Sequence, residues 1–119
     1  MGSFQIGLRH TFKLTDAIWN YFISDAEDLH ANKAETDLML HLAPDTVDMS
    51  AVQDDLDRTV GKVFSYPVAQ TSLNGVTGAP SQGTAEAGKL LFHEMGDALT
   101  ALLERAKTES PPLDHSLSS

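Results

Sequence analysis

The sequence predicts a protein that is rich in helix and has only a few short strands. Three segments repeat apolar residues at helical spacing, and each follows a Thr, Ser, Asp or Asn that can cap a helix. Between these segments, short apolar runs are bounded by Gly and Pro, which is typical of short strands. The 119 residues are enough for one small domain with a modest core.

Charge and composition exclude several classes of partner. The formal net charge is -9, and we expect no nucleic acid partner because phosphate binding needs clustered Lys and Arg. The chain has no cysteine, which excludes disulfides and thiolate metal sites and is typical of a cytoplasmic protein. No apolar stretch is long enough to cross a bilayer, so we expect no membrane partner.

The N-terminal segment, residues 1–14, alternates apolar residues with polar residues or Gly, which predicts a strand or an extended loop. Thr15 or Asp16 then caps a helix that we expect to run to about Ser24. Trp19 lies off the apolar stripe of this helix. It either covers the helix edge, which we favour, or forms a wall of a substrate pocket or a subunit contact.

A second helix is predicted from Asn32 to Ala43, because Pro44 opposes its continuation. Asn32 and Glu35 have the spacing of a capping box. Within this helix, Asp37 and His41 are four residues apart and predict a solvated pair.

The remaining chain reads as loops followed by a long helix. Residues 44–61 are polar and acidic and predict a loop with at most a short helix, residues 60–66 predict a short strand, and residues 76–77 predict a short buried strand. Ser81 or Thr84 is expected to cap a helix running to about Lys107. Gly88 and Gly96 on this helix each cost about 1 kcal/mol relative to Ala, which suggests close backbone packing there. Residues 108–119, with two prolines and four serines, predict a disordered tail.

An acidic loop with one imidazole precedes the second helix. It contains Asp25, Glu27, Asp28 and His30. Such oxygens with one nitrogen are suitable ligands for a hard divalent ion, although a solvated loop has the same composition. On a regular helix His30 and Glu35 would lie about 140° apart. They can reach one pocket only if His30 belongs to the loop, as the Asn32 cap predicts.

Two ordered motifs resemble the creatininase (creatinine amidohydrolase) family. The first is His30-Ala-Asn-Lys-Ala-Glu35-Thr36, followed by an apolar helix that ends in Pro-Asp-Thr-Val, and the second is the glycine turn Asn-Gly-Val-Thr-Gly at residues 74–78. The resemblance covers roughly residues 4–107 and only the C-terminal half of the family. It implies that residues 1–107 are a partial domain, the C-terminal portion of a creatininase-like three-layer α/β fold, and that the chain begins mid-fold.

The resemblance also implies a chemistry. Family members are metal-dependent hydrolases of C–N amide bonds in small molecules, use zinc, manganese or iron, and commonly form homo-oligomers. A metal-bound water attacks the carbonyl carbon, and a histidine that maps to His30 passes the proton to the leaving nitrogen. Glu35 maps to a metal ligand or to a group that orients one. Acidic residues before the histidine help to bind substrate in the family, which implies this role for Glu27 and Asp28. Trp19 is a further candidate for the substrate pocket, on the ground of its aromatic side chain alone.

One departure from the family is large. Most of its metal ligands lie in the N-terminal half, in a Glu-x-His pair, a following Asp and an Asn-Gly-His motif, none of which is present here. A metal centre needs three or more protein ligands, and His30 with Glu35 supply two at best. We therefore expect activity only with the missing N-terminal half or with other family subunits. The alternatives are a non-catalytic remnant that oligomerises or binds a partner, and an unrelated acidic module that binds a cation or a basic partner.

Overall fold

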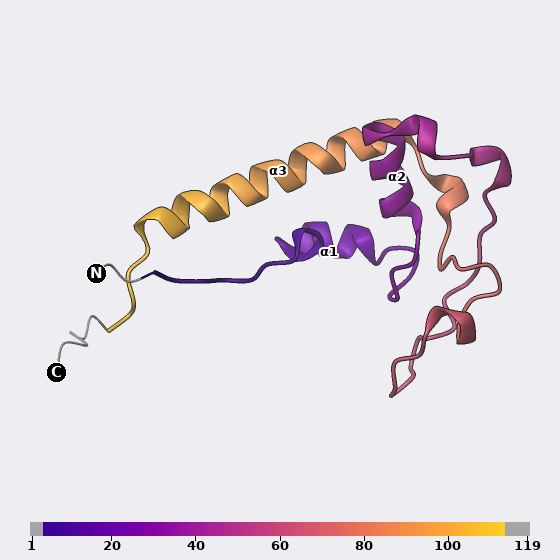
Figure 1. Cartoon of the computed structure of the whole chain (residues 1–119), viewed down its shortest axis with the longest axis horizontal. Coiled ribbons are helices and arrows are strands. Elements are labelled where there is room, and N and C mark those ends of the chain that lie inside the picture. Colours follow the sequence, from indigo (N-terminus) through magenta and orange to yellow (C-terminus); the bar gives the residue numbers. More distant parts are fainter. Residues whose placement is uncertain (1–3, 114–119) are drawn as a thin grey trace.

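The computed structural model describes residues 4–113, and three α-helices dominate this part of the chain (Figure 1). They are α1 (Asp16–Phe22), α2 (Lys33–Leu42) and α3 (Ala85–Thr108). Five single turns of 3-10 helix accompany them: η1 (Thr11–Lys13), η2 (Pro44–Thr46), η3 (Met49–Ala51), η4 (Val68–Gln70) and η5 (Pro80–Gln82). The helix-rich character that the sequence predicts is thus confirmed. The predicted tail overlaps α3 at residue 108, and its residues 114–119 lie outside the described part.

Each α-helix begins at a residue that the sequence marks as a cap. The side chain of Thr15 accepts from the N–H of Ile18, that of Asn32 from Glu35, and that of Thr84 from Ala87. These bonds satisfy one of the free N–H groups in each first turn. The Ser81 alternative for α3 is wrong, because Ser81 lies in the separate turn η5.

The core is small and lies where the three α-helices meet. Its buried members are Ile18 and Phe22 of α1, Ala34 of α2 and Leu91 of α3. Gly88 lets α3 approach α2 closely, since a Cβ there would lie 1.8 Å from the carbonyl oxygen of Asp37. The predicted close packing at Gly88 is therefore confirmed. At Gly96 it is wrong, because nothing lies within 4 Å of a Cβ built at that position.

A buried polar cluster joins the helices beside this core. The carboxylate of Asp37 is fully buried and accepts from the hydroxyl of Tyr21 at 2.5 Å, the amine of Lys33 at 2.8 Å and the backbone N–H of Thr84 at 2.7 Å. Burial and the bond to Asp37 raise the pKa of Tyr21. Burial lowers the pKa of Lys33, but its bonds to Asp37 and Tyr21 outweigh this and raise it. The predicted solvated pair of Asp37 with His41 is wrong, because this cluster takes up both carboxylate oxygens.

The predicted short strands are wrong for the part of the chain that is described. Residues 4–113 contain no strand, only an isolated antiparallel bridge between Asp55 and Gly78. Residues 60–66 form a turn in which Gly61 has a φ of 77° and Val63 is 90% exposed. Residues 76–77 thread between loops instead of pairing with a strand. A strand needs a neighbouring strand along its length, whereas within residues 4–113 the segment 76–77 makes a single backbone bond, from Thr77 to His30, beside the bridge at Gly78.

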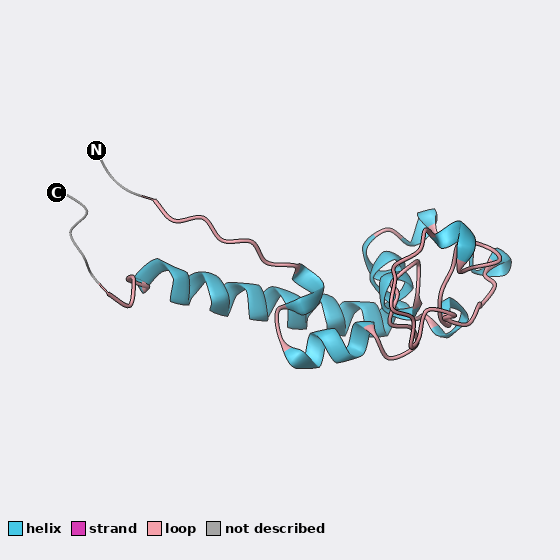
Figure 2. Ribbon diagram, turned by 90° about the horizontal axis from the view of Figure 1, so that it is seen from below, coloured by secondary structure: helices cyan, strands magenta, loops and turns pink. Residues whose placement is uncertain are grey.

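The chain is long for its size. Its radius of gyration is 18.8 Å, whereas a compact chain of this length has about 13.5 Å. The C-terminal half of α3 and the extended residues 4–10 project away from the other elements, on the same side of the molecule (Figures 1 and 2). No helix among residues 4–113 combines the length and the apolarity that a membrane crossing requires.

Candidate functional site

His30 lies in the loop between α1 and α2, as its proposed role requires, and two hydrogen bonds to Thr77 fix its backbone. The N–H of His30 donates to the hydroxyl of Thr77 at 3.2 Å, and the N–H of Thr77 donates to the carbonyl of His30 at 2.9 Å. The same hydroxyl donates to the carbonyl of Asp28. Thr77 is completely buried, so a segment 47 residues away in sequence sets the position of the histidine.

The imidazole of His30 is paired with a carboxylate of the same loop. Its Nε2 atom lies 3.3 Å from an oxygen of Asp28, and both side chains are about one-third exposed (37% and 33%). An adjacent carboxylate orients an imidazole ring and forms an ion pair with it when the ring is protonated. His30 and Asp28 are thus two predicted site residues that the fold brings together.

The backbone after His30 is held in an uncommon conformation. Ala31 has a φ of 49°, which makes it the one non-glycine residue with positive φ among residues 4–113. This conformation costs a residue with a Cβ roughly 1 kcal/mol or more. The buried side chain of Asn32 helps to hold it by donating to the carbonyl of Phe22 at 2.6 Å and to Asp25 at 3.0 Å. The histidine loop is therefore fixed on both sides.

Two acidic residues of the region anchor loops instead of facing outward. One oxygen of Asp25 accepts from the N–H of Lys33 at 2.8 Å and from that of Ala79 at 2.7 Å. Asp57 accepts from the N–H groups of Glu27 and Asp28. Burial raises the pKa of the Asp57 carboxyl, but bonds from Thr59, Glu27 and Asp28 outweigh this and lower it. Spacing in the sequence does not predict that Asp25 and Asp57 anchor loops, because the N–H groups of Ala79, Glu27 and Asp28 that they bind are distant in the chain.

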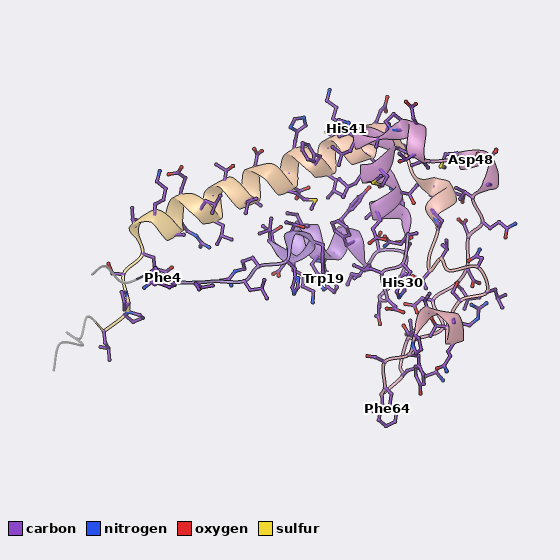
Figure 3. The ribbon with its side chains drawn as sticks, viewed as in Figure 1. Phe4, Trp19, His30, His41, Asp48 and Phe64 are labelled. Carbon is purple, nitrogen blue, oxygen red and sulfur yellow. The ribbon has the colours of Figure 1, made fainter. Side chains whose placement is uncertain are left out.

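The other predicted site residues lie in separate places. Glu35 lines a groove of about 500 Å³ with Met39, Asp48, Asn74 and Val76, and His30 is not among its lining residues. Glu27 and Asp28 line a second groove, of about 230 Å³, against the turn at residues 62–66. Trp19 lies on α1, where its ring packs 6.0 Å from that of Phe12, and Figure 3 shows it apart from His30.

The favoured interpretation of Trp19 as a packing residue agrees with its contacts. It is half-buried against the core, and the amine of Lys13 lies 4.4 Å from its ring centroid. A cation over an indole face is worth about 0.5–1 kcal/mol at an exposed site.

The described residues do not form a complete metal site. Among residues 4–113, no three His, Asp or Glu side chains are grouped so that they could hold an ion. In the acidic loop, backbone N–H groups already occupy Asp25, and Glu35 lies in a different groove from Glu27 and Asp28. The donor set thus does not fit a self-contained divalent-metal centre.

Comparisons with known proteins agree with the sequence motifs. The family model described as creatininase, creatinine amidohydrolase, matches residues 8–103. No curated protein matches the chain. Among solved structures, a Bacteroides fragilis protein assigned as a creatinine amidohydrolase is similar with a TM-score of 0.71 and 22% sequence identity, which shows a shared fold. The match covers 98% of this chain and 46% of that one, so the chain spans about half the length of this relative. Since the family model covers most of the sequence, this chain belongs to the creatininase family.

Proposed function

We propose that this chain is the C-terminal part of a metal-dependent amidohydrolase that hydrolyses a C–N amide bond of a small molecule, with His30 as the proton shuttle. The observation that carries the proposal is the fixed His30–Asp28 pair. Thr77 and Asn32 hold its loop, the ring nitrogen lies 3.3 Å from the carboxylate, and the imidazole remains open to solvent. A histidine held in this way can receive a proton and return it to a leaving nitrogen.

Other residues of this chain are assigned to orienting the imidazole and to binding the substrate. Asp28 orients the imidazole, and together with Glu27 it contributes acceptor oxygens for substrate N–H groups in their shared groove. Trp19 supplies an apolar wall in the assembled enzyme. The substrate-binding role of Glu27 and Asp28 rests on the family resemblance, and that of Trp19 rests on its aromatic side chain. All three side chains keep exposed surface.

A divalent metal, zinc, manganese or iron, supplies the activation of water in such enzymes. Because the described residues lack a three-ligand set, we propose that a complementary polypeptide holds most of the metal and that Glu35 adds one carboxylate. This polypeptide is the missing N-terminal half or another family subunit, and several copies of the completed unit form a homo-oligomer. The chain by itself is then inactive.

A second candidate function is a non-catalytic remnant that binds a family enzyme or oligomerises. The incomplete ligand set favours it, and so do exposed apolar residues in the loops, among them Phe64 at 73% and Leu73 at 86% exposed. This candidate predicts that assembly restores no hydrolysis.

Reconstitution tests the proposal. The full chain is mixed with the separately expressed part of the Bacteroides fragilis relative that has no counterpart here, with zinc or manganese, and loss of creatinine or of a simple amide is followed by chromatography. We expect hydrolysis with wild-type chain and at least a hundredfold loss with His30→Ala. His93→Ala, which removes an exposed histidine from α3, is the matched control and keeps full activity. Equal rates for wild type and His30→Ala would reject His30 as the shuttle.

Metal binding is tested separately by native mass spectrometry of the chain with added zinc and manganese. We expect no tightly held ion on the chain alone and one or two ions on the assembled pair. One or two tightly held ions on the chain alone would show that its site is self-contained and would contradict the division of ligands between two polypeptides.

A further inference from the structure

The glycine turn at residues 74–78 contains the one Asn-Gly pair of the chain, Asn74-Gly75. An asparagine followed by glycine can modify itself, because the backbone nitrogen of the next residue and the side-chain carbonyl carbon close a five-membered ring. Glycine has no Cβ to obstruct this approach. Asn74 and Gly75 are both exposed, and nothing lies within 4 Å of a Cβ built at Gly75. The attacking nitrogen and water therefore both have access to the carboxamide.

The backbone N–H of Gly75, which would supply the attacking nitrogen, has no bond to break first. Among residues 4–113, no hydrogen bond uses this N–H as its donor. The two neighbouring amides are engaged, because the N–H of Asn74 donates to the hydroxyl of Ser72 at 3.3 Å and the N–H of Val76 donates to the side chain of Asn74 at 3.0 Å. The turn thus leaves free the one amide that the ring closure needs.

The carboxamide of Asn74 is held and polarised by its neighbours. Its oxygen, Oδ1, accepts the bond from the N–H of Val76, and its nitrogen, Nδ2, donates to the carbonyl of Gln53 at 3.1 Å. A donor at the oxygen stabilises the negative charge that develops there when a nucleophile adds to the carbonyl carbon. The bond to Gln53 keeps the group in this orientation.

We propose that Asn74 is a site of spontaneous deamidation, with water as the co-reactant. The nitrogen of Gly75 gives its proton to solvent and bonds to Cγ of Asn74. The tetrahedral intermediate then expels the side-chain nitrogen, which takes up a proton and leaves as ammonia. Water opens the resulting succinimide at the side-chain carbonyl to give aspartate, or at the backbone carbonyl to give isoaspartate. One water is consumed and one ammonia is released, and no metal or partner is needed.

The other two asparagines lack these properties. Asn20 is exposed, but it lies inside α1, where the N–H of the next residue, Tyr21, is a helix donor and its side chain crowds the approach. Asn32 is fully buried, and the N–H of Lys33 after it donates to a carboxylate at 2.8 Å. The reaction is therefore specific to Asn74.

The products alter the turn that positions the histidine loop. Aspartate at position 74 has no N–H to donate to the carbonyl of Gln53. Isoaspartate also inserts its Cβ into the main chain between residues 74 and 75, which lengthens the turn. Thr77 follows shortly after and holds the backbone of His30 through two hydrogen bonds. We therefore expect isoaspartate at position 74 to loosen the loop that carries His30.

The test incubates the full chain at 37 °C and follows each asparagine by peptide mapping with mass spectrometry, with isoaspartate identified by enzymatic methylation of its carboxylate. We expect Asn74 to convert at least about tenfold faster than Asn20 or Asn32. The rate should rise about tenfold between pH 7 and pH 8, because the attacking nitrogen must lose its proton. Gly75→Ala should slow the reaction at least about tenfold, whereas Gly61→Ala, at another open glycine with positive φ, should leave it unchanged.

The same chain unfolded in guanidinium chloride separates the effect of the fold from that of the Asn-Gly sequence. We expect folded and unfolded chains to react within about threefold of each other, because the donor at Oδ1 offsets the restricted motion of the turn. A larger slowing in the folded chain would show that the turn shields Asn74 and would overturn the proposal. Equal rates for wild type and Gly75→Ala would overturn it as well, because the nitrogen of Gly75 would not be the nucleophile.

Hydrogen exchange followed by NMR tests the consequence for the histidine loop. The N–H of Thr77 should exchange at least about tenfold faster in the isoaspartate form than in the fresh chain, because its bond to the carbonyl of His30 is weakened. The N–H of Trp19, which is bonded within the cap of α1, is the control and should be unchanged. Unchanged exchange at Thr77 would reject the link between the modification and His30.

Discussion

Substitution of Gly88 by alanine tests the contact between α2 and α3. In an open helix this change stabilises the fold by about 1 kcal/mol, because glycine has more backbone freedom to lose. At Gly88, however, the new Cβ would lie 1.8 Å from the carbonyl oxygen of Asp37 and 2.4 Å from its carbonyl carbon. Both are backbone atoms of α2, so the two helices must separate.

The magnitude follows from the size of that clash. Overpacking costs typically 1–3 kcal/mol, and a clash with backbone belongs at the upper end, about 3 kcal/mol. After the gain in helix propensity is subtracted, Gly88→Ala should destabilise the full chain by about 2 kcal/mol. Separation of the helices also disturbs the bonds of Asp37 to Tyr21 and Thr84, which adds to the loss.

The assay is urea unfolding of the full chain followed by circular dichroism at 222 nm. Gly96→Ala is the matched control, because it lies on the same helix with nothing within 4 Å of its Cβ and should gain about 1 kcal/mol. The two variants should therefore move the midpoint in opposite directions. If Gly88→Ala stabilised the chain as much as Gly96→Ala, the close approach of α2 and α3 would be refuted.

Two further predictions concern the loops. Thr77→Val leaves the N–H of His30 and the carbonyl of Asp28 without a partner and should cost about 1–3 kcal/mol in the same assay. The control variant Thr100→Val, on the exposed face of α3, should change stability by less than about 0.5 kcal/mol. Similar costs for the two variants would rule out the role of Thr77 in anchoring the histidine loop. The pKa of Asp57 is lowered on folding, so its contribution to stability is present above about pH 4 and is lost as the pH falls through the folded value. Asp57→Asn should therefore flatten the fall of the urea midpoint between pH 7 and pH 2, and an unaltered pH profile would show that the loop bonds of Asp57 add no stability.

Local sequence rules account for the helices of this protein. Thr15, Asn32 and Thr84 cap them, and Pro44 follows the end of α2, as expected from residue types alone. The interactions that decide a cap lie within four residues, so the sequence contains both partners. The same holds for the placement of His30 in a loop, which follows from the cap at Asn32.

Strands and polar pairs could not be predicted in this way. The apolar run at residues 60–66 has the composition of a strand, but pairing depends on a neighbour that the described residues lack. Asp37 has both Lys33 and His41 four residues away on α2, and it pairs with Lys33, because Tyr21 and Thr84 from remote parts of the chain bind the same carboxylate. In both cases the deciding partner is remote in the chain or is not found among residues 4–113.

By itself, the sequence determined the family, the three helices and the loop position of His30, because motifs, caps and apolar periodicity are local properties. The tertiary structure decided which groups meet. It paired His30 with Asp28, used Asp25 and Asp57 as loop anchors, and placed Glu35 in a separate groove. The physical reason is that a hydrogen bond or an ion pair requires contact within about 3–4 Å, and only the folded path of the chain sets that distance.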